Sequence, residues 1–204
     1  MNSIDELDFS KTYTYADYYS WRFEERLELI KGKIFRMSPA PTGNHQKVSF
    51  NISGELYIFL KDKSCEAYTA PFDVRLVKDE TSDKEVSTVV QPDICVICDL
   101  TKVADTRSCL GSPDIMVEVL SPGNSKKQLK IKYDLYEEFG VKEYWIVYPK
   151  EQSMLQYFRN SDGRFVTNRG PLISGDTLTT PILPGFKLEI EDVFRKLPLN
   201  TEQE

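Results

Sequence analysis

The sequence is poor in the residues that build soft-metal sites. Among 204 residues there is one histidine, His45, which excludes a site built from several histidines, and there are four cysteines. Two of these, Cys95 and Cys98, have the spacing of a zinc knuckle or a redox motif. Their run, DICVICD, has the pattern of a β-strand, in which side chains three apart point to opposite faces. We therefore expect two small buried apolar residues and no metal site.

Long hydrophobic runs are also lacking. No apolar stretch approaches the roughly 18 residues of a membrane span. The N-terminal segment carries acidic side chains and has no apolar core of the kind found in signal peptides. These two absences predict a cytoplasmic protein without a membrane partner. The net charge of −6 argues against binding to nucleic acid through bulk charge, but it is compatible with a local basic groove.

The length predicts a single domain over residues 1–204, with flexible tails at 1–14 and 197–204. Thr14 is a suitable cap for one or two short helices that we expect between Tyr15 and Arg26. Further along, the alternation of apolar runs, turn residues and helical stripes predicts the following elements: a hairpin over 27–37, a loop over 38–44, a helix over 45–60, strands over 66–70 and 73–77, a solvated loop over 78–87, a hairpin over 154–166, and a closing strand over 181–190 followed by a short helix near 192–195.

The central part of the chain predicts a β-α-β unit. Residues 89–98 and 113–120 are almost continuously apolar, which is typical of strands covered on both faces. Ser125 is a suitable N-cap for a helix over 126–139, Gly140 a suitable stop, and a third apolar run over 143–148 follows. A strand, a helix and a strand in this order indicate a parallel crossover, which belongs to an α/β or α+β fold.

Two acidic residues interrupt the apolar strands. Asp93 lies within the run over 89–98, and Glu118 has apolar neighbours on both sides in Met-Val-Glu-Val-Leu. Mg²⁺ prefers oxygen ligands and usually takes one or two protein carboxylates, so this pair is a candidate metal site, with Mn²⁺ as the other possible ion. Asp114 shares the strand face of Glu118, but it follows Pro113 at the strand start, where a turn-forming Asp is common. We therefore rank Glu118 above it.

A lysine near these acids would complete a site for phosphodiester hydrolysis, because an ammonium group can position water or meet developing charge. On the helix over 126–139, Lys132 falls in the middle of the apolar arc, whereas Lys127 and Lys130 fall on the polar face. A lysine that faces the core is costly unless it has a partner, and the strand acids are the nearest candidates. The alternative is a lysine that extends over apolar surface to reach solvent.

Three more residues are candidates for the site. Glu28 lies between apolar neighbours, so it is either an exposed strand residue or a carboxylate directed into the site. His45 lies at a helix start, where a capping role competes with a role next to the acids. Gln91 precedes Asp93 by two positions and is a candidate neighbour of the acids.

At these residues the sequence resembles the Uma-two family of endonucleases, within the PD-(D/E)XK restriction endonuclease-like superfamily. The resemblance covers about residues 15 to 190. It is carried by these pieces: Glu28-Leu29-Ile30-Lys31-Gly32, Met37-Ser38-Pro39 followed by His45, Gln91-Pro92-Asp93, Glu118-Val119-Leu120-Ser121-Pro122, Lys132 with Tyr136, and Gly140-Val141-Lys142-Glu143-Tyr144-Trp145. It implies a mixed sheet flanked by helices, with antiparallel C-terminal strands and a metal-dependent nuclease site.

The resemblance also implies roles for individual residues. Asp93 matches the first acid of the superfamily motif, Glu118 the second, and Glu28 an N-terminal acid that joins the metal shell in some members. The motif lysine, two positions after the second acid, is replaced here by Leu120. Families of this type can supply the lysine from the adjacent helix, and Lys132 matches that position. In the same helix Gln128 stands where many relatives have Asp.

The hypothesis from the sequence is a magnesium-dependent endonuclease that acts on nucleic acid, with DNA as the first choice. Asp93, Glu118 and Glu28 would bind the metal, and Lys132 would orient the attacking water. One alternative is a nucleic-acid-binding or protein-interaction module that keeps the fold without hydrolysis. Another is a phosphodiesterase that acts on small nucleotides. Analogy with restriction enzymes suggests a homodimer.

Overall fold

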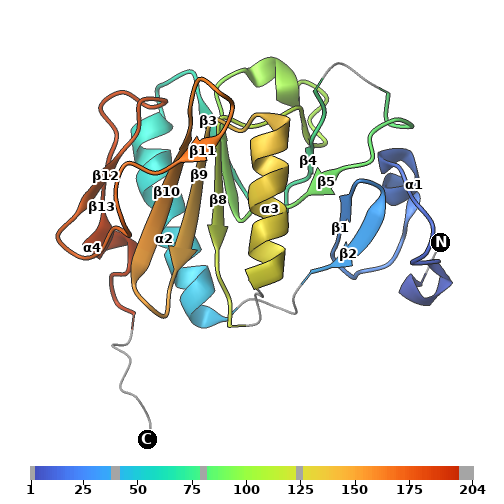
Figure 1. The fold of residues 1–204 in the computed structure, drawn as a ribbon, viewed down its shortest axis with the longest axis horizontal. Coiled ribbons are helices and arrows are strands. Elements are labelled where there is room, and N and C mark those ends of the chain that lie inside the picture. Colours follow the sequence, from blue (N-terminus) through green and yellow to red (C-terminus); the bar gives the residue numbers. More distant parts are fainter. Residues whose placement is uncertain (1–2, 38–41, 79–81, 123–125, 198–204) are drawn as a thin grey trace, which may run out of the picture.

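The computed structural model describes residues 3–37, 42–78, 82–122 and 126–197. Its centre is a six-stranded mixed β-sheet with the strand order β11-β10-β9-β8-β6-β3. Helix α3 (Lys126–Phe139) covers the front face of this sheet in Figure 1, and α2 (Gly43–Leu60) covers the back. This is the mixed sheet flanked by helices that the sequence predicts.

The two central strands are buried along their whole length. Every residue of β6 (Ile94–Ile97) and β8 (Ile115–Val119) is buried. Successive side chains of these strands point to opposite helices. Val96 packs in the cluster with α2, whereas Cys95 packs in the cluster with Tyr136 of α3. Two covered faces explain why these strands have continuous apolar runs in the sequence.

The predicted parallel crossover is confirmed. Strand β8 pairs in parallel with β9 (Glu143–Tyr148), and α3 connects them with the bounds that the sequence predicts. Gly140 ends the helix with a φ of 83°, a left-handed conformation that glycine adopts without a steric cost. The predicted cap Ser125 lies outside the described residues. Helix α3 thus covers one face of the six-stranded sheet.

A second sheet lies beside the first, on the right in Figure 1, with the strand order β2-β1-β5-β4-β7. Its strands are β1 (Leu27–Ile30), β2 (Lys33–Arg36), β4 (Val74–Arg75), β5 (Val89–Val90) and β7 (Cys109–Leu110). The predicted hairpin is confirmed as β1 and β2, and its turn residues Lys31 and Gly32 both have positive φ. The local sequence pattern of this hairpin does not indicate that it belongs to a separate sheet.

The prediction of one strand over 89–98 is wrong. The chain leaves the five-stranded sheet after Val90 and enters the six-stranded sheet at Ile94. Between them lies Pro92, which has no N–H group and so cannot donate to a strand ladder. The short link of Gln91, Pro92 and Asp93 therefore passes from one sheet to the other.

The expectation of a flexible tail over 1–14 is also wrong for the described residues 3–14. This segment covers the apolar face of β1, where it buries Ile4, Leu7 and Tyr13 in a cluster with the five-stranded sheet. The helix α1 (Tyr15–Ser20) follows, and Thr14 caps it as predicted. At the other end, residues 198–204 lie outside the described part.

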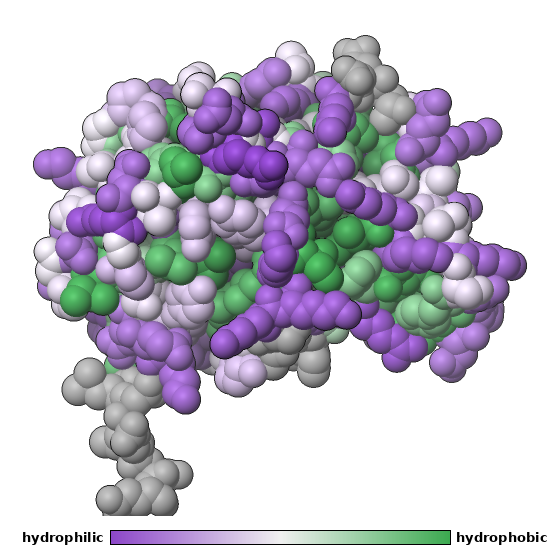
Figure 2. Space-filling model, in the orientation of Figure 1, coloured by the Kyte–Doolittle hydropathy of each residue, from purple (hydrophilic) through white to green (hydrophobic). Residues whose placement is uncertain are grey.

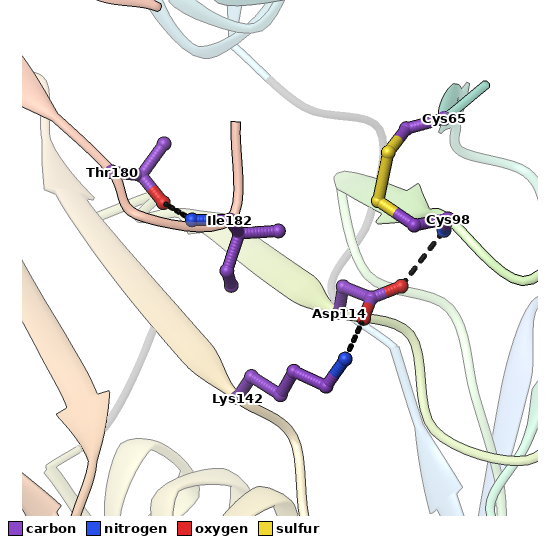
Figure 3. Close-up of a disulfide and its surroundings, with 6 residues drawn as sticks. All are labelled: Cys65, Cys98, Asp114, Lys142, Thr180 and Ile182. Atoms are coloured by element: carbon purple, nitrogen blue, oxygen red, sulfur yellow. Dashed lines mark hydrogen bonds and ion pairs between the residues drawn. A yellow bond between two sulfur atoms is a disulfide. The ribbon is translucent and has the colours of Figure 1, made fainter. Parts of the chain in front are cut away.

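The prediction that Cys98 is a buried thiol is wrong, because Cys98 forms a disulfide with Cys65 (Figure 3). Glu66, which follows Cys65, pairs with Ile97, which precedes Cys98, so the antiparallel ladder brings the two cysteines together. Asp114 also lies here: its Oδ2 accepts a hydrogen bond from the Cys98 N–H at 2.8 Å, and its Oδ1 lies 2.5 Å from the ammonium group of Lys142. Asp114 thus supports this corner of the sheet, away from Glu118.

The C-terminal elements agree with the predicted antiparallel cover. They are β10 (Ser153–Arg159), β11 (Phe165–Val166), β12 (Thr177–Thr179) and β13 (Lys187–Glu189), followed by the short helix α4 (Ile190–Val193). The other described elements are η1 (Ile4–Glu6), β3 (Glu66–Thr69) and η2 (Leu100–Val103). Of the predicted loop over 38–44, residues 38–41 lie outside the described part, and α2 begins at Gly43, earlier than expected. None of the described helices is both long and apolar enough to span a membrane.

Candidate active site

The three predicted acids lie in one cleft where the two sheets meet. Glu28 comes from β1 of the five-stranded sheet, Asp93 from the link between the sheets, and Glu118 from β8 of the six-stranded sheet. The cleft has a volume of about 110 Å³, and Lys132, His45 and Gln91 line it as well. Figure 2 shows hydrophobic surface between α3 and the β1–β2 hairpin, framed by hydrophilic side chains. The structure therefore brings all six predicted site residues together.

Strand alternation directs Glu28 into the cleft. Its neighbours Leu27 and Leu29 are buried in the cluster with the N-terminal segment, so the carboxylate points to the opposite face of β1. There, Glu28 Oε1 accepts a hydrogen bond of 2.9 Å from the backbone N–H of Gln91. The link between the sheets thus fixes the position of this carboxylate, which excludes the alternative of an exposed strand residue.

Backbone and side-chain contacts hold Asp93. Its Oδ2 accepts a hydrogen bond of 2.8 Å from the backbone N–H of Val119, so the carboxylate is held at the end of β8. His45 Nε2 lies 3.2 Å from the other oxygen, Oδ1. His45 is brought there by the first turn of α2, where the Thr42 hydroxyl accepts a hydrogen bond from the His45 N–H. Thr42 is the helix cap, so His45 is available to contact Asp93.

Two side chains of α3 hold Glu118. Met116 packs with α3, and alternation along β8 places Glu118 on the same face of the sheet. Its Oε1 accepts hydrogen bonds from the Tyr136 hydroxyl at 2.6 Å and from the Lys132 ammonium at 2.8 Å. Residues four apart on a helix share a face, so one side of α3 supplies both donors.

Lys132 bridges two of the acids. Its Nζ lies 2.8 Å from Glu118 Oε1 and 3.0 Å from Glu28 Oε1, and only 16% of its side chain is exposed. Burial by itself lowers the pKa of a lysine, but these two carboxylates outweigh that effect and raise the pKa of Lys132. Lys132 therefore stays charged at neutral pH and acts as a hydrogen-bond donor. The alternative of a lysine that extends into solvent is excluded.

The acids carry more negative charge than Lys132 can neutralise. Burial raises the pKa of Glu118 to about 7; Lys132 opposes this rise, whereas the charges of Asp93 and Glu28 add to it. Near neutral pH, Glu118 is therefore partly protonated. An additional cation in the cleft would favour its ionised form.

The side chain of Gln91 points away from the acids. Only its backbone N–H contacts Glu28, while its amide contacts Arg26, Asp73 and Tyr18. Gln91 is thus close to the acids in the chain, as predicted, but it belongs to a different hydrogen-bond network.

Two side chains at the site have contacts that the sequence does not predict. Tyr136 appears beside Lys132 in the resemblance without a role, although its position four residues after Lys132 could have indicated the shared partner Glu118. Arg26 was placed at the end of a helical segment, yet it precedes Glu28 by two positions and so shares its strand face. Leu120, which occupies the usual motif position of the lysine, lines the same cleft as Lys132.

Carboxylates are the ligands that Mg²⁺ prefers, so the donor set of the cleft suits this ion. Within the described residues, however, no group of three or more His, Cys, Asp and Glu side chains is arranged to hold a metal ion. The ammonium of Lys132 lies between Glu28 and Glu118 and takes the place of a shared cation there. A site with two carboxylates and several waters, built from Asp93 and Glu118, is the arrangement that these residues fit.

Comparisons with known proteins agree with this fold. A family model named Uma2 and described as "Putative restriction endonuclease" matches residues 15–191. A crystal structure of a protein from Anabaena variabilis, described as a putative nuclease belonging to DUF820, superimposes with a TM-score of 0.66 at 18% sequence identity, and the match covers 89% of this chain and 97% of that one. At this identity the likeness concerns the fold alone. No curated protein matches the chain.

Proposed function

Because the chain belongs to the Uma2 family of restriction endonuclease-like proteins, we propose that it is a metal-dependent nuclease that hydrolyses phosphodiester bonds of nucleic acid, with DNA as the first substrate to test. The observation that carries the proposal is the contact of Lys132 with Glu28 and Glu118 in the cleft that also contains Asp93. A charged lysine beside clustered carboxylates can support hydrolysis of a phosphodiester, because the cation stabilises the charge that develops on the phosphate.

In this proposal each side chain has a defined task. Asp93 and Glu118 would hold Mg²⁺ or Mn²⁺, with Glu28 next to them. When bound, such a metal would polarise the phosphate and lower the pKa of a water molecule. Lys132, which is charged at neutral pH, would donate a hydrogen bond that orients the attacking water. Tyr136 would keep Glu118 Oε1 in place, so that the other oxygen of Glu118 can face the metal.

The test is a cleavage assay on supercoiled plasmid DNA and on labelled DNA and RNA oligonucleotides, with Mg²⁺, with Mn²⁺ and with EDTA. We expect cleavage by the wild type with either metal and none with EDTA. An Asp93→Ala/Glu118→Ala variant and a Lys132→Ala variant should lose at least about a hundredfold in rate, as expected when a group that stabilises the transition state is removed.

A matched control is the Glu151→Ala/Asp162→Ala variant, which removes two exposed acids outside the cleft and changes the net charge by the same amount. It should cleave like the wild type. Equal activity in the control and in the Asp93→Ala/Glu118→Ala variant would sink the proposal.

One observation favours a second candidate function, a module that binds nucleic acid or protein without hydrolysis. Lys132 already partners two of the three acids, and the described residues hold no group of three or more His, Cys, Asp and Glu side chains arranged for a metal ion. For such a module we expect binding of oligonucleotides or of a protein partner but no cleavage with either metal. Cleavage of model phosphodiesters without cleavage of polymers would instead favour an enzyme for small nucleotides.

The proposed nuclease would need two active sites to cut both strands of a duplex in one encounter, and a homodimer would supply them. Sedimentation velocity over a range of protein concentrations tests this point. A monomer at all concentrations would limit the proposal to the cutting of single strands.

A further inference from the structure

An arginine lies in the cleft beside the acids, and no role is assigned to it so far. Arg26 directly precedes β1, and alternation places its side chain on the same face as Glu28 and Ile30, all of which line the cleft. The β1–β2 hairpin thus contributes a cation as well as an acid.

A neutral acceptor holds the guanidinium of Arg26. Gln91 Oε1 accepts hydrogen bonds from Arg26 Nε at 3.0 Å and from Arg26 Nη2 at 2.8 Å. These two bonds use one edge of the planar guanidinium. The remaining N–H groups can therefore bind another partner.

The amide of Gln91 is itself fixed. Its Nε2 donates to Asp73 Oδ1 at 2.8 Å and to the Tyr18 hydroxyl at 3.1 Å, and the Tyr18 hydroxyl donates to Asp73 at 3.1 Å. A flipped amide would place its oxygen against the Asp73 carboxylate, which can only accept. Gln91 Oε1 must therefore face Arg26, and the guanidinium is positioned before any ligand arrives.

The positive charge of Arg26 has no ion-pair partner within the described parts of the chain. Lys132, by contrast, is bonded to two carboxylates of the cleft. Arg36 of β2 borders the cleft, but it pairs with Leu27 and its guanidinium lies 5.0 Å from the centre of the Phe9 ring, so its charge is directed to the other face of the hairpin. Arg26 thus presents positive charge in the cleft beside the acids.

We propose that Arg26 binds a phosphate group of the nucleic acid that occupies this cleft, and that Gln91, Asp73 and Tyr18 are positioning residues that act through it. The inference rests on the proposed function. A polyanion would be repelled by Glu28, Asp93 and Glu118, so binding needs a cation that the acids do not already neutralise. A guanidinium matches the geometry of a phosphate, because two of its N–H groups can contact two phosphate oxygens.

The test measures the affinity for a fluorescent oligonucleotide, single-stranded and duplex, by polarisation in EDTA at 50 to 200 mM KCl, a salt range in which phosphate contacts are resolved. For Arg26→Ala we expect about a tenfold weaker affinity that does not depend on base sequence, and a slope of log affinity against log salt that is smaller by about one. The matched control is Arg195→Ala, which removes an exposed arginine near the C-terminal end of the described chain. Its guanidinium lies 3.8 Å from the Asp192 carboxylate. It should bind like the wild type.

Gln91→Leu tests the positioning role. It keeps all charges but removes the acceptor for Arg26, so it should weaken binding severalfold in the wild type and have no further effect in Arg26→Ala. A role of Gln91 in stability alone would give additive losses. If Arg26→Ala does not fold, as judged by its melting temperature, Arg26→Lys replaces it and should keep the salt slope while losing affinity.

The outcomes separate this inference from the proposed function. If the wild type binds or cleaves nucleic acid and Arg26→Ala behaves like Arg195→Ala, the role of Arg26 is overturned and the nuclease proposal stands. If the wild type neither binds nor cleaves any of the probes, both fall together.

Discussion

At the scale of single residues, the cleft depends on one buried cation. Lys132 is 16% exposed, and the side chains of its partners Glu118 and Glu28 are 11% and 7% exposed, so these charges are largely removed from water. Breaking a buried ion pair by removing one partner leaves an uncompensated charge and is strongly destabilising. Lys132→Met should therefore lower the free energy of unfolding by about 3 kcal/mol at pH 8, measured by urea denaturation in EDTA.

The same helix supplies the control for this prediction. Lys130 is 74% exposed and pairs with Asp134, one turn further along α3. An exposed pair of this kind contributes about 0.5 kcal/mol or less, so Lys130→Met should leave stability almost unchanged. Similar losses in the two variants would show that Lys132 has no special electrostatic role.

Glu118 predicts how stability depends on pH. Burial raises its pKa in the folded protein to about 7, above the ordinary value of a glutamate. Between these two values the folded state binds more protons than the unfolded state, so the contribution of Glu118 to stability is present at acidic pH and is lost as the pH rises through about 7. The melting temperature in EDTA should therefore fall between about pH 5 and pH 8.

Glu118→Gln isolates this contribution, because the amide keeps the shape of the side chain without titrating. Asp73 and Glu143, whose pKa values burial also raises, are the same in both proteins, so their effects cancel in the difference. The melting temperature of Glu118→Gln should fall less steeply over the same pH range. Parallel curves for the two proteins would mean that Glu118 does not titrate there.

At the scale of elements, local patterns predict what lies within one element. The start and stop signals Ser125 and Gly140 gave the bounds of α3, and its apolar arc gave the inward direction of Lys132. Alternation along β8 placed Glu118 on the face that α3 covers. These predictions rest on the periods of helix and strand, which the sequence displays directly.

Contacts between elements were harder to predict. The apolar run over 89–98 concealed a change of sheet, because both halves are buried and only Pro92 marks the break. Cys65 and Cys98 are 33 residues apart, and only the pairing of β3 with β6 makes them neighbours. The partners of Gln91 come from α1 and the start of β4, so no local pattern indicates them.

The disulfide gives a prediction at this scale, because it joins the residues next to β3 and β6. Two cysteines are free and buried, so the denatured, unreduced protein should release two thiols in a thiol assay and four after reduction. Closing a loop of this length stabilises a protein by roughly 2–4 kcal/mol, which Cys98→Ser should remove.

The control for the disulfide is Cys95→Ala, which changes a buried thiol that is not bonded to another cysteine. For this variant, the thiol assay should still count two more thiols after reduction than before it. Four free thiols in the unreduced wild type would contradict the bond. Disulfides are rare in a reducing cytosol, so the thiol count should be made on protein purified without reductant.

At the scale of the whole molecule, the cleft lies where the five-stranded and the six-stranded sheets meet. Glu28 belongs to the five-stranded sheet, whereas Glu118 belongs to the six-stranded sheet, and Lys132 of α3 joins the two carboxylates. The protein has a net charge of −6, yet the cation Arg26 lies in the cleft beside the acids. Local placement of charge can thus serve an anionic substrate although the overall charge opposes it.

This arrangement predicts that a bound cation stabilises the molecule as a whole. A ligand present at about 100 times its dissociation constant contributes roughly 2.7 kcal/mol to the free energy of unfolding, which for a chain of this size raises the melting temperature by about 5 to 10 °C. We expect such a rise with Mg²⁺ or Mn²⁺ in the wild type, and binding in calorimetry with the same dissociation constant. Hydrogen exchange should also slow at β1 and β8, because the cation would add attraction where the acids of the two sheets now repel one another.

Asp93→Ala/Glu118→Ala should show none of these effects, whereas Glu151→Ala/Asp162→Ala should show all of them. A rise of equal size in both variants would mean that the metal binds elsewhere, and no rise in the wild type would rule out a metal site that forms without substrate.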